Sequence, residues 1–293
     1  MPVIGERPEI TLDDIVLATD FSVAAKRATK YAIEIARRYG SRLHIVNVVN
    51  LNAPIAAADV SYVLPLKELT DNAQALLSEL SRSLEGLPCT TQVAEGFSVS
   101  DAILNAAREC DASLIVMGTT SKAMWEKMLL GSTAEEVIRT AKIPVLTVGP
   151  HVSDLQECAV PFQRIVFAND WSDRARKTLP IAFAFAEDGR AHLYLCRVAP
   201  ALAKGEPPTD DAALLHSMET SIPPGATDWC KTECVIEHGK ASQSILDLAE
   251  RTNADLIILA ARSSTFRLVY LEKGVTPAVI AAAKCPVLSY CPA

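Results

Sequence analysis

The chain contains one pattern of segments twice, and this internal repeat restricts the possible folds more than any other feature. A strand-like segment beginning at Ile15 and running through Asp20 recurs 150 positions later, from Ile165 through Asp170. Three further pairs follow in the same order: Leu43–Val48 with Leu193–Val198, Glu95-Gly96 with His238-Gly239, and Ala141–Leu146 with Ala283–Leu288. Four matched segments in one order indicate a duplicated domain rather than a short solenoid repeat.

The length agrees with duplication, because 293 residues suit two domains of roughly 150 residues each. A stretch with prolines and polar residues, Gly149 to Pro161, separates the two copies. We therefore expect one domain over residues 1–150 and a second over residues 160–293.

Each copy alternates short apolar runs with segments of helical periodicity. In the first copy Ile15–Thr19 is a continuous apolar run, Ser22 is a helix-capping residue, and Gly40 ends the helix that follows. The remaining expected elements are strands at 43–49, 90–95, 114–117 and 144–148, and helices at 66–84, from Ser98 or Ser100 to 108, and at 132–142. Such alternation predicts an α/β fold with two doubly wound, Rossmann-like, five-stranded parallel sheets in tandem.

The last strand of each copy is apolar, at Pro144–Val148 and Pro286–Leu288. An unpaired apolar edge strand is an aggregation hazard, so we expect these two strands to pair within the chain. The two halves would then form an internal pseudo-dimer, and a further homodimer stays open.

Charge and composition exclude several classes of protein. The net charge is −7 and neither half carries a basic excess, which argues against a nucleic-acid partner. No apolar run is long enough for a membrane span and no signal peptide is recognised, so we expect a soluble cytoplasmic protein with no membrane partner. The eight cysteines are expected to be structural in that reducing compartment.

One pair of segments is typical of a phosphate cradle. Gly118 and Thr119 directly follow the strand that ends at Met117, and Gly131-Ser132 opens a later helix. A glycine allows close backbone approach, and a helix N-terminus offers free N–H groups to an anion. Neither a Walker A motif nor GxGxxG occurs in the chain.

With these residues each half resembles the universal stress protein family, whose fold is described as adenine nucleotide alpha hydrolase-like. The resemblance rests on the strand ending in Asp20, the glycines 118 and 131, and the closing segment Lys142–Leu146. The family's adenine-nucleotide signature is Gly-x2-Gly-x9-Gly-Ser/Thr. Gly118, Gly131 and Ser132 match it, whereas Ser121 stands at the middle glycine.

The resemblance implies a binding site for ATP or another adenine nucleotide in the first half. It places Asp20 near the ribose and adenine, where the carboxylate could also bind Mg²⁺, and the backbone of Val48 against the adenine edge. The N–H groups of the Gly131 segment would take the phosphates. The expected cofactor-binding residues are Asp20, Val48, Met117, Gly118, Thr119, Ser121, Gly131, Ser132 and Thr133.

The second half departs from this signature. Ala260 and Ser263 replace the first two glycines, and Gly274 is followed by Val275 instead of a hydroxyl residue. Pro180 lies deep enough in the first helix of this half to kink it. We therefore expect one nucleotide per chain, bound in the first half.

No catalytic constellation or metal site is predicted, because the five histidines are scattered and match no catalytic motif. Slow ATP hydrolysis is the most that the site is expected to support.

The leading interpretation is a stress-response regulator whose nucleotide tunes its conformation or its choice of an unidentified protein partner. The alternative is a nucleotide-free interaction and dimerisation scaffold. A third interpretation, an ATP- or flavin-using enzyme, is weaker because the SGGxDS loop of such enzymes does not occur in the sequence. Residues 50–65 are expected to form a mobile flap over the first site.

Overall fold

The computed structural model describes residues 11–51, 66–119, 130–153, 160–171, 173–199, 210–260 and 274–292. The predicted flap lies outside these residues apart from Asn50 and Leu51, and Asn50 belongs to a strand. Ser121 also lies outside the described residues. Within the described part of the chain, no helix combines the length and apolar character that a membrane crossing requires.

The described residues of the first half form five strands and four helices in the predicted alternating order. They are β1 (Asp14–Ala18), α1 (Val23–Tyr39), β2 (Arg42–Asn50), α2 (Leu66–Ser83), β3 (Cys89–Gly96), α3 (Val99–Glu109), β4 (Leu114–Gly118), α4 (Ser132–Thr140) and β5 (Val145–Val148). The order repeats in the second half, with one additional short helix. Its elements are β6 (Arg164–Ala168), α5 (Asp173–Gly189), β7 (His192–Ala199), α6 (Asp211–Glu219), α7 (Ala226–Trp229), β8 (Lys231–His238), α8 (Ala241–Arg251), β9 (Leu256–Ala260), α9 (Val275–Ala282) and β10 (Val287–Tyr290).

Local sequence signals explain where α1 begins and ends. The Ser22 Oγ accepts a hydrogen bond from the N–H of Ala25 at 3.2 Å, which caps the helix. Gly40 ends α1 in the left-handed conformation with φ 68°, and its N–H donates to the carbonyl of Ala36.

One proline lies beyond the end of α4 and another lies inside α5. Helix α4 ends at Thr140, two residues before the predicted end at Lys142, because the C-cap residue Ala141 already has an extended ψ of 135°. In the second half α5 runs from Asp173 to Gly189 with Pro180 inside it, and the kink expected at this proline stays a prediction.

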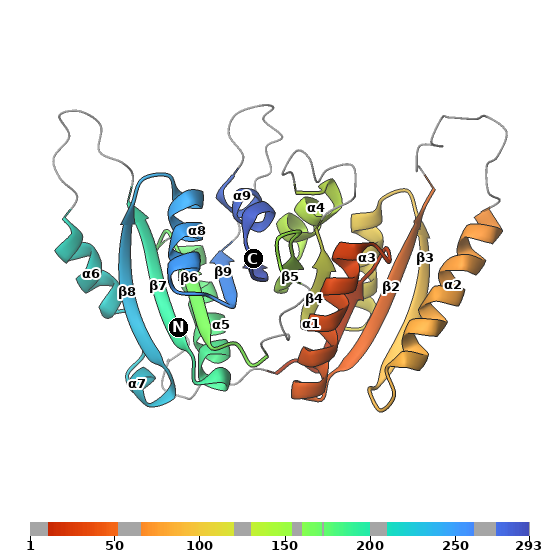
Figure 1. Ribbon diagram of the computed structural model, residues 1–293, viewed down its shortest axis with the longest axis horizontal. Coiled ribbons are helices and arrows are strands. Elements are labelled where there is room, and N and C mark those ends of the chain that lie inside the picture. Colours follow the sequence, from red (N-terminus) through yellow and green to blue (C-terminus); the bar gives the residue numbers. More distant parts are fainter. Residues whose placement is uncertain are drawn as a thin grey trace.

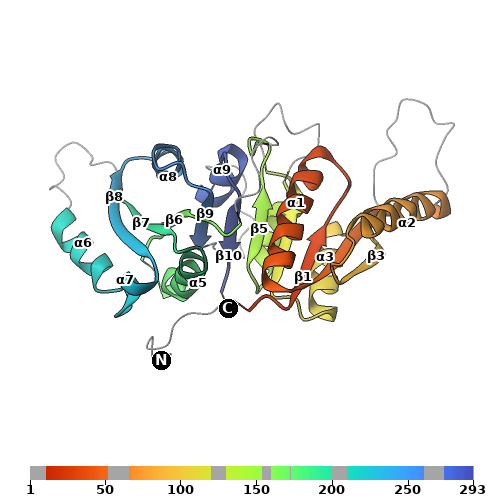
Figure 2. The ribbon, with the colours of Figure 1, turned by 60° about the horizontal axis from the view of Figure 1, so that its bottom comes forward.

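The ten strands found in the described part of the chain lie in one sheet, in the order β3-β2-β1-β4-β5-β10-β9-β6-β7-β8. Pairing is parallel within each half, as predicted, and antiparallel between β5 and β10, where Leu146 faces Leu288. Figure 2 shows these two strands side by side at the centre of the molecule. The prediction that the closing strands join the two halves is therefore confirmed, and the two five-stranded sheets form one continuous sheet.

Helices cover both faces of this sheet, and the two halves resemble each other across the centre (Figure 1). One hydrophobic cluster contains residues of α1, α2, α5, α6 and α7, and the other contains residues of α3, α4, α8 and α9. Each cluster draws buried side chains from both halves. On each face of the sheet the hydrophobic core therefore continues across the β5–β10 junction instead of being divided between the two halves.

The repeat extends to unusual backbone conformations. Phe21 and Trp171 both follow the first strand of a half with positive φ, at 58° and 56°. Asp111 and Asn253 likewise have φ values of 50° and 49°. Non-glycine residues adopt this region rarely, so its recurrence at equivalent positions supports duplication of a whole domain.

The junction generates the first prediction. Leu288 is 1% exposed and lies opposite Leu146. Replacing Leu288 by Ala should lower the free energy of unfolding by about 2–5 kcal/mol, since truncation leaves a cavity in a shared core. Urea unfolding would measure this.

The matched control is Leu76→Ala on α2, where the side chain is 44% exposed. Its effect should stay within about 0.5 kcal/mol. Equal effects of the two substitutions would contradict a packed junction.

Candidate functional site

The predicted site residues come together at the carboxyl ends of neighbouring strands. Strands β1 and β4 pair side by side, with Ala18 opposite Met117, so Asp20 and Gly118 both follow at the same edge of the sheet. Ligands of doubly wound sheets bind at this edge. The structure therefore brings together residues that lie about a hundred positions apart in the sequence.

Asp20 forms the turn that leads from β1 into α1. Its Oδ1 accepts a hydrogen bond from the N–H of Ser22 at 3.0 Å, next to Phe21 with its positive φ. The side chain is exposed. Asp20 therefore has a structural role in the turn and remains accessible to a ligand or cation.

The backbone of Val48 continues β2 beyond the end of its pairing with β1. That pairing ends where the N–H of Thr19 donates to the carbonyl of Val46 at 2.9 Å. Along a strand the backbone groups of alternate residues point to the same side, so the N–H and C=O of Val48 face the same direction as those of Val46. Val48 therefore directs its backbone groups past the end of β1, toward the edge that carries Asp20.

Gly118 is required for packing between β4 and α1. A Cβ at this position would lie 2.6 Å from the carbonyl carbon of Ala24 and 2.7 Å from the nitrogen of Ala25. The backbone that approaches Gly118 closely is therefore the first turn of α1, at the glycine where the sequence predicted close approach to a ligand. Sequence alone could not identify which group the missing side chain avoids.

Thr119 joins the end of β4 to the start of α4. Its carbonyl accepts a hydrogen bond from the N–H of Gly131 at 3.2 Å, and its hydroxyl donates to the carbonyl of Val148 at 3.4 Å. Thr119 is buried, so its side chain supports the sheet edge. The Gly118 and Gly131 segments are held together although ten residues between them lie outside the described part of the chain.

The N-terminus of α4 receives no cap from the side chain of its N-cap residue. Gly131 is the N-cap residue, with no side-chain cap, and its carbonyl accepts from the N–H of Glu135 at 3.0 Å. The N–H groups of Ser132, Thr133 and Ala134 have no acceptor within the helix, as is general for a first turn. They add to the positive end of the helix dipole, whereas the Glu135 carboxylate in the same turn opposes it.

Comparison with known proteins identifies this architecture. The model of the universal stress protein family matches the chain twice, over residues 11–149 and 161–290. The chain belongs to the universal stress protein family.

Individual relatives agree with this assignment. A universal stress protein of Methanocaldococcus jannaschii is 36% identical over 137 residues, which cover 46% of this chain and 80% of the relative. One from Thermus aquaticus is 33% identical over 134 residues, covering 46% of this chain and 96% of the relative. The crystal structure of a universal stress protein from Archaeoglobus fulgidus has a TM-score of 0.77 at 21% identity, covering 97% of this chain and 98% of that one. The last likeness supports the tandem fold.

The second universal stress protein domain lacks several features of the first site. Ala260 ends β9 where Gly118 ends β4, and α9 begins after Gly274, again with no side-chain cap. The third residue of α9 is Pro277, which has no N–H, so its first turn offers fewer donors than that of α4. Sequence patterns alone did not indicate this loss, although Pro277 lies only three positions after the N-cap glycine.

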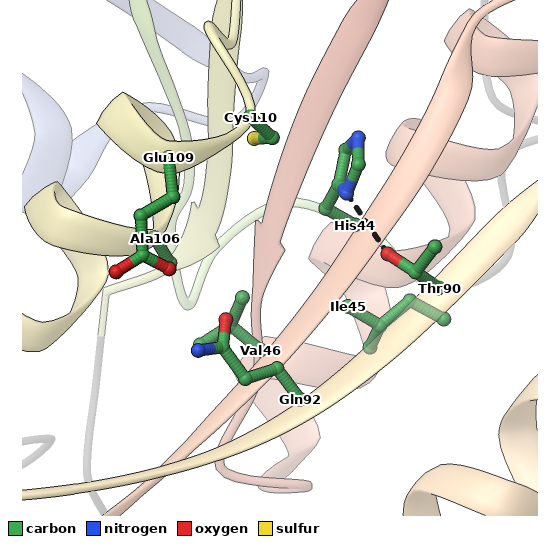
Figure 3. Close-up of a pocket in the computed structure, with 8 residues that line it drawn as sticks. All are labelled: His44, Ile45, Val46, Thr90, Gln92, Ala106, Glu109 and Cys110. Carbon is green, nitrogen blue, oxygen red and sulfur yellow. Dashed lines mark hydrogen bonds between the residues drawn. The ribbon is translucent and has the colours of Figure 1, made fainter.

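The structure also has a small cavity away from this site. It encloses about 140 Å³ between α3 and strands β2 and β3, with His44, Glu109 and Cys110 among its lining residues (Figure 3). The His44 ring is held by Asp14, 2.7 Å from its Nε2, and by Thr90, 2.8 Å from its Nδ1. The cavity is small for a nucleotide and lies near the amino ends of the strands, so it is separate from the predicted edge.

Metal and thiol chemistry have little support among the described residues. Nowhere in that part of the chain do three or more His, Cys, Asp or Glu residues form a group that could hold a metal ion. Its seven cysteines are free thiols. Burial raises the pKa of both Cys196 and Cys285 to about 12, which keeps these thiols protonated and unreactive.

The packing of Gly118 generates the second prediction. Gly118→Ala should lower the free energy of unfolding by about 1–3 kcal/mol without any nucleotide, because the new Cβ collides with the α1 backbone. Denaturant unfolding of nucleotide-free protein measures the effect.

Gly96→Ala at the end of β3 is the control, since its Cβ would meet no atom closer than 3.6 Å. Its effect should be smaller than about 1 kcal/mol. If Gly118→Ala were equally mild, the glycine would not be a packing requirement.

Proposed function

We propose that this universal stress protein binds one adenine nucleotide, ATP foremost, in its first domain. The site is the sheet edge at the ends of β1 and β4 together with the N-terminus of α4. The observation that carries the proposal is the uncapped first turn of α4, fastened to the end of β4 by the hydrogen bond from Gly131 to Thr119. A cradle of backbone N–H groups fixed beside a strand end suits a phosphate chain.

The other groups at this edge fit the remaining parts of a nucleotide. The backbone of Val48 offers a donor and an acceptor for an adenine edge. The exposed carboxylate of Asp20 suits ribose hydroxyls or a Mg²⁺ ion carried by the phosphates. None of these residues is a general base placed for hydrolysis, so binding is the proposed activity and the nucleotide acts as an effector in the cytoplasm.

A nucleotide-free scaffold is the second candidate, and a specific observation favours it. Asp20 and Gly118 both have structural roles without a ligand, in the turn before α1 and in the packing of α1. On this alternative, the domain pair offers a surface to a protein partner, and the glycine signature persists for packing alone.

Calorimetric titration with ATP and Mg²⁺ is the third prediction and separates the two candidates. One nucleotide should bind per chain. Gly131→Asp should abolish binding, since an aspartate at this N-cap accepts the first-turn N–H groups and repels phosphate. The φ of −66° at Gly131 accommodates a side chain, but the new Cβ would lie 3.3 Å from the carbonyl oxygen of Thr119, so urea unfolding of the variant is measured alongside binding.

The matched control is Gly274→Asp, at the equivalent N-cap of α9 with φ −53°. It should leave both affinity and stoichiometry unchanged. A stoichiometry of two would contradict the proposal and make Asn169 and Trp171 candidate ligands, since their buried side-chain nitrogens have no hydrogen-bond partner among the described residues. No binding by the parent chain would leave the scaffold as the better account.

A further inference from the structure

The two long helices α1 and α5 meet at their C-terminal ends through one charged group. The Arg38 guanidinium donates from Nε to Asp188 Oδ2 and from Nη2 to Asp188 Oδ1, both at 2.8 Å. Nη2 also donates to the Asp188 carbonyl at 3.2 Å. The Tyr39 hydroxyl donates to Asp188 Oδ2 at 2.7 Å. One carboxylate of the second half thus accepts three hydrogen bonds from the first half.

The two charged residues occupy equivalent positions in the duplicated domain. Helices α1 and α5 are each 17 residues long and begin 150 positions apart, which aligns Arg38 with Asp188. Equivalent residues that touch each other must lie beside the pseudo-two-fold axis that relates the halves. The pairing of Leu146 with Leu288 marks the same axis within the sheet.

Duplication has been accompanied by a reversal of charge at this axis. The last turn of α1 carries Arg37 and Arg38, which suit the negative end of the helix dipole. The corresponding residues of α5 are Glu187 and Asp188, and α5 has no basic residue in its last turn. Acidic residues at a helix C-terminus are unfavourable by themselves, so their presence calls for a compensating partner. Arg38 is that partner, and it also donates to the carbonyl of Asp188 in the last turn of α5.

We propose that Arg38 and Asp188 form a specificity pair that selects association of a first domain with a second domain over association of like domains. A contact between two first domains would place Arg38 against Arg38. A contact between two second domains would place Asp188 against Asp188. Only the unlike pair is complementary, and the discrimination comes from the repulsion in both alternatives.

The geometry explains why so exposed a pair can discriminate. The side chains of Arg38 and Asp188 are 35% and 22% exposed, and ordinary surface ion pairs contribute little. This pair is bidentate and includes Tyr39, which makes it more specific than a single contact. Burial and the hydrogen bond to Asp188 raise the pKa of Tyr39, so its hydroxyl stays a donor at neutral pH.

The chain also prevents Tyr39 from having a counterpart. The equivalent residue is Gly189, where a Cβ would lie only 1.9 Å from the carbonyl oxygen of Phe162 in the segment that leads into β6. The linking segment therefore occupies the space that a second tyrosine would need. The junction is built asymmetrically around one acceptor and two donor side chains.

A charge-swap cycle in the full chain tests the proposal. Arg38→Asp reproduces the contact of two second domains, and Asp188→Arg reproduces that of two first domains. Each should raise the unfolded-to-folded ratio in urea unfolding by roughly 5- to 30-fold. The double variant Arg38→Asp/Asp188→Arg should return to within about 3-fold of the parent, because the pair is complementary again.

Arg82→Asp in the last turn of α2 is the control for Arg38→Asp, because it makes the same change in net charge at the end of a distant helix. It has the same helix-dipole cost but no interdomain partner, so it should raise the ratio by less than about 5-fold. Single reversals no worse than this control would overturn the proposal. So would a double variant whose defect equals the product of the single defects, since simple helix damage predicts that result. If either single variant fails to fold, folding of the double variant decides between the same two outcomes.

Discussion

The antiparallel pairing of β5 with β10 is the interaction on which the rest of the structure depends. Both strands are short and almost entirely buried, and each ends the sheet of its own half. Left unpaired, each strand would expose apolar side chains together with a row of unsatisfied backbone N–H and C=O groups. Pairing satisfies both edges at once and joins two five-stranded sheets into a single ten-stranded one. It also lets the hydrophobic clusters on both faces extend across the two domains.

This arrangement separates structural demands from functional ones. The junction uses the β5 and β10 edges and the C-terminal ends of α1 and α5, whereas the proposed binding site lies at the carboxyl ends of β1 and β4. The second domain can therefore lose site features, such as Gly118 replaced by Ala260 and a helix start that contains Pro277, while the junction remains intact. Duplication gives the chain two copies of the fold and leaves one copy free to diverge.

Much of the fold could be predicted because its signals are local or repeated. Ser22 and Gly40 mark the ends of α1 by short-range hydrogen bonds. The alternation of apolar strand segments with helical segments predicts that the strands of each half pair in parallel. The pairing of the last strands followed from their apolar sequence.

The site was less predictable because its geometry depends on contacts that are distant in sequence. The reason for Gly118 is the backbone of Ala24 and Ala25, which a pattern of glycines cannot reveal. The contact of Arg38 with Asp188 spans 150 positions and becomes visible only when the symmetry of the two helices is known. Pro277, by contrast, was a local signal that could have been interpreted from the sequence.

Native-state hydrogen exchange of the junction strands tests the central claim most directly. If β5 and β10 hold one shared core together, the amides of Val145–Val148 and Val287–Tyr290 that bond across the junction should exchange as slowly as those of β1 and β6. Their exchange should require the same global opening. Rapid exchange of β5 and β10, while β1 and β6 remain protected, would show that the halves separate without unfolding and would contradict this account.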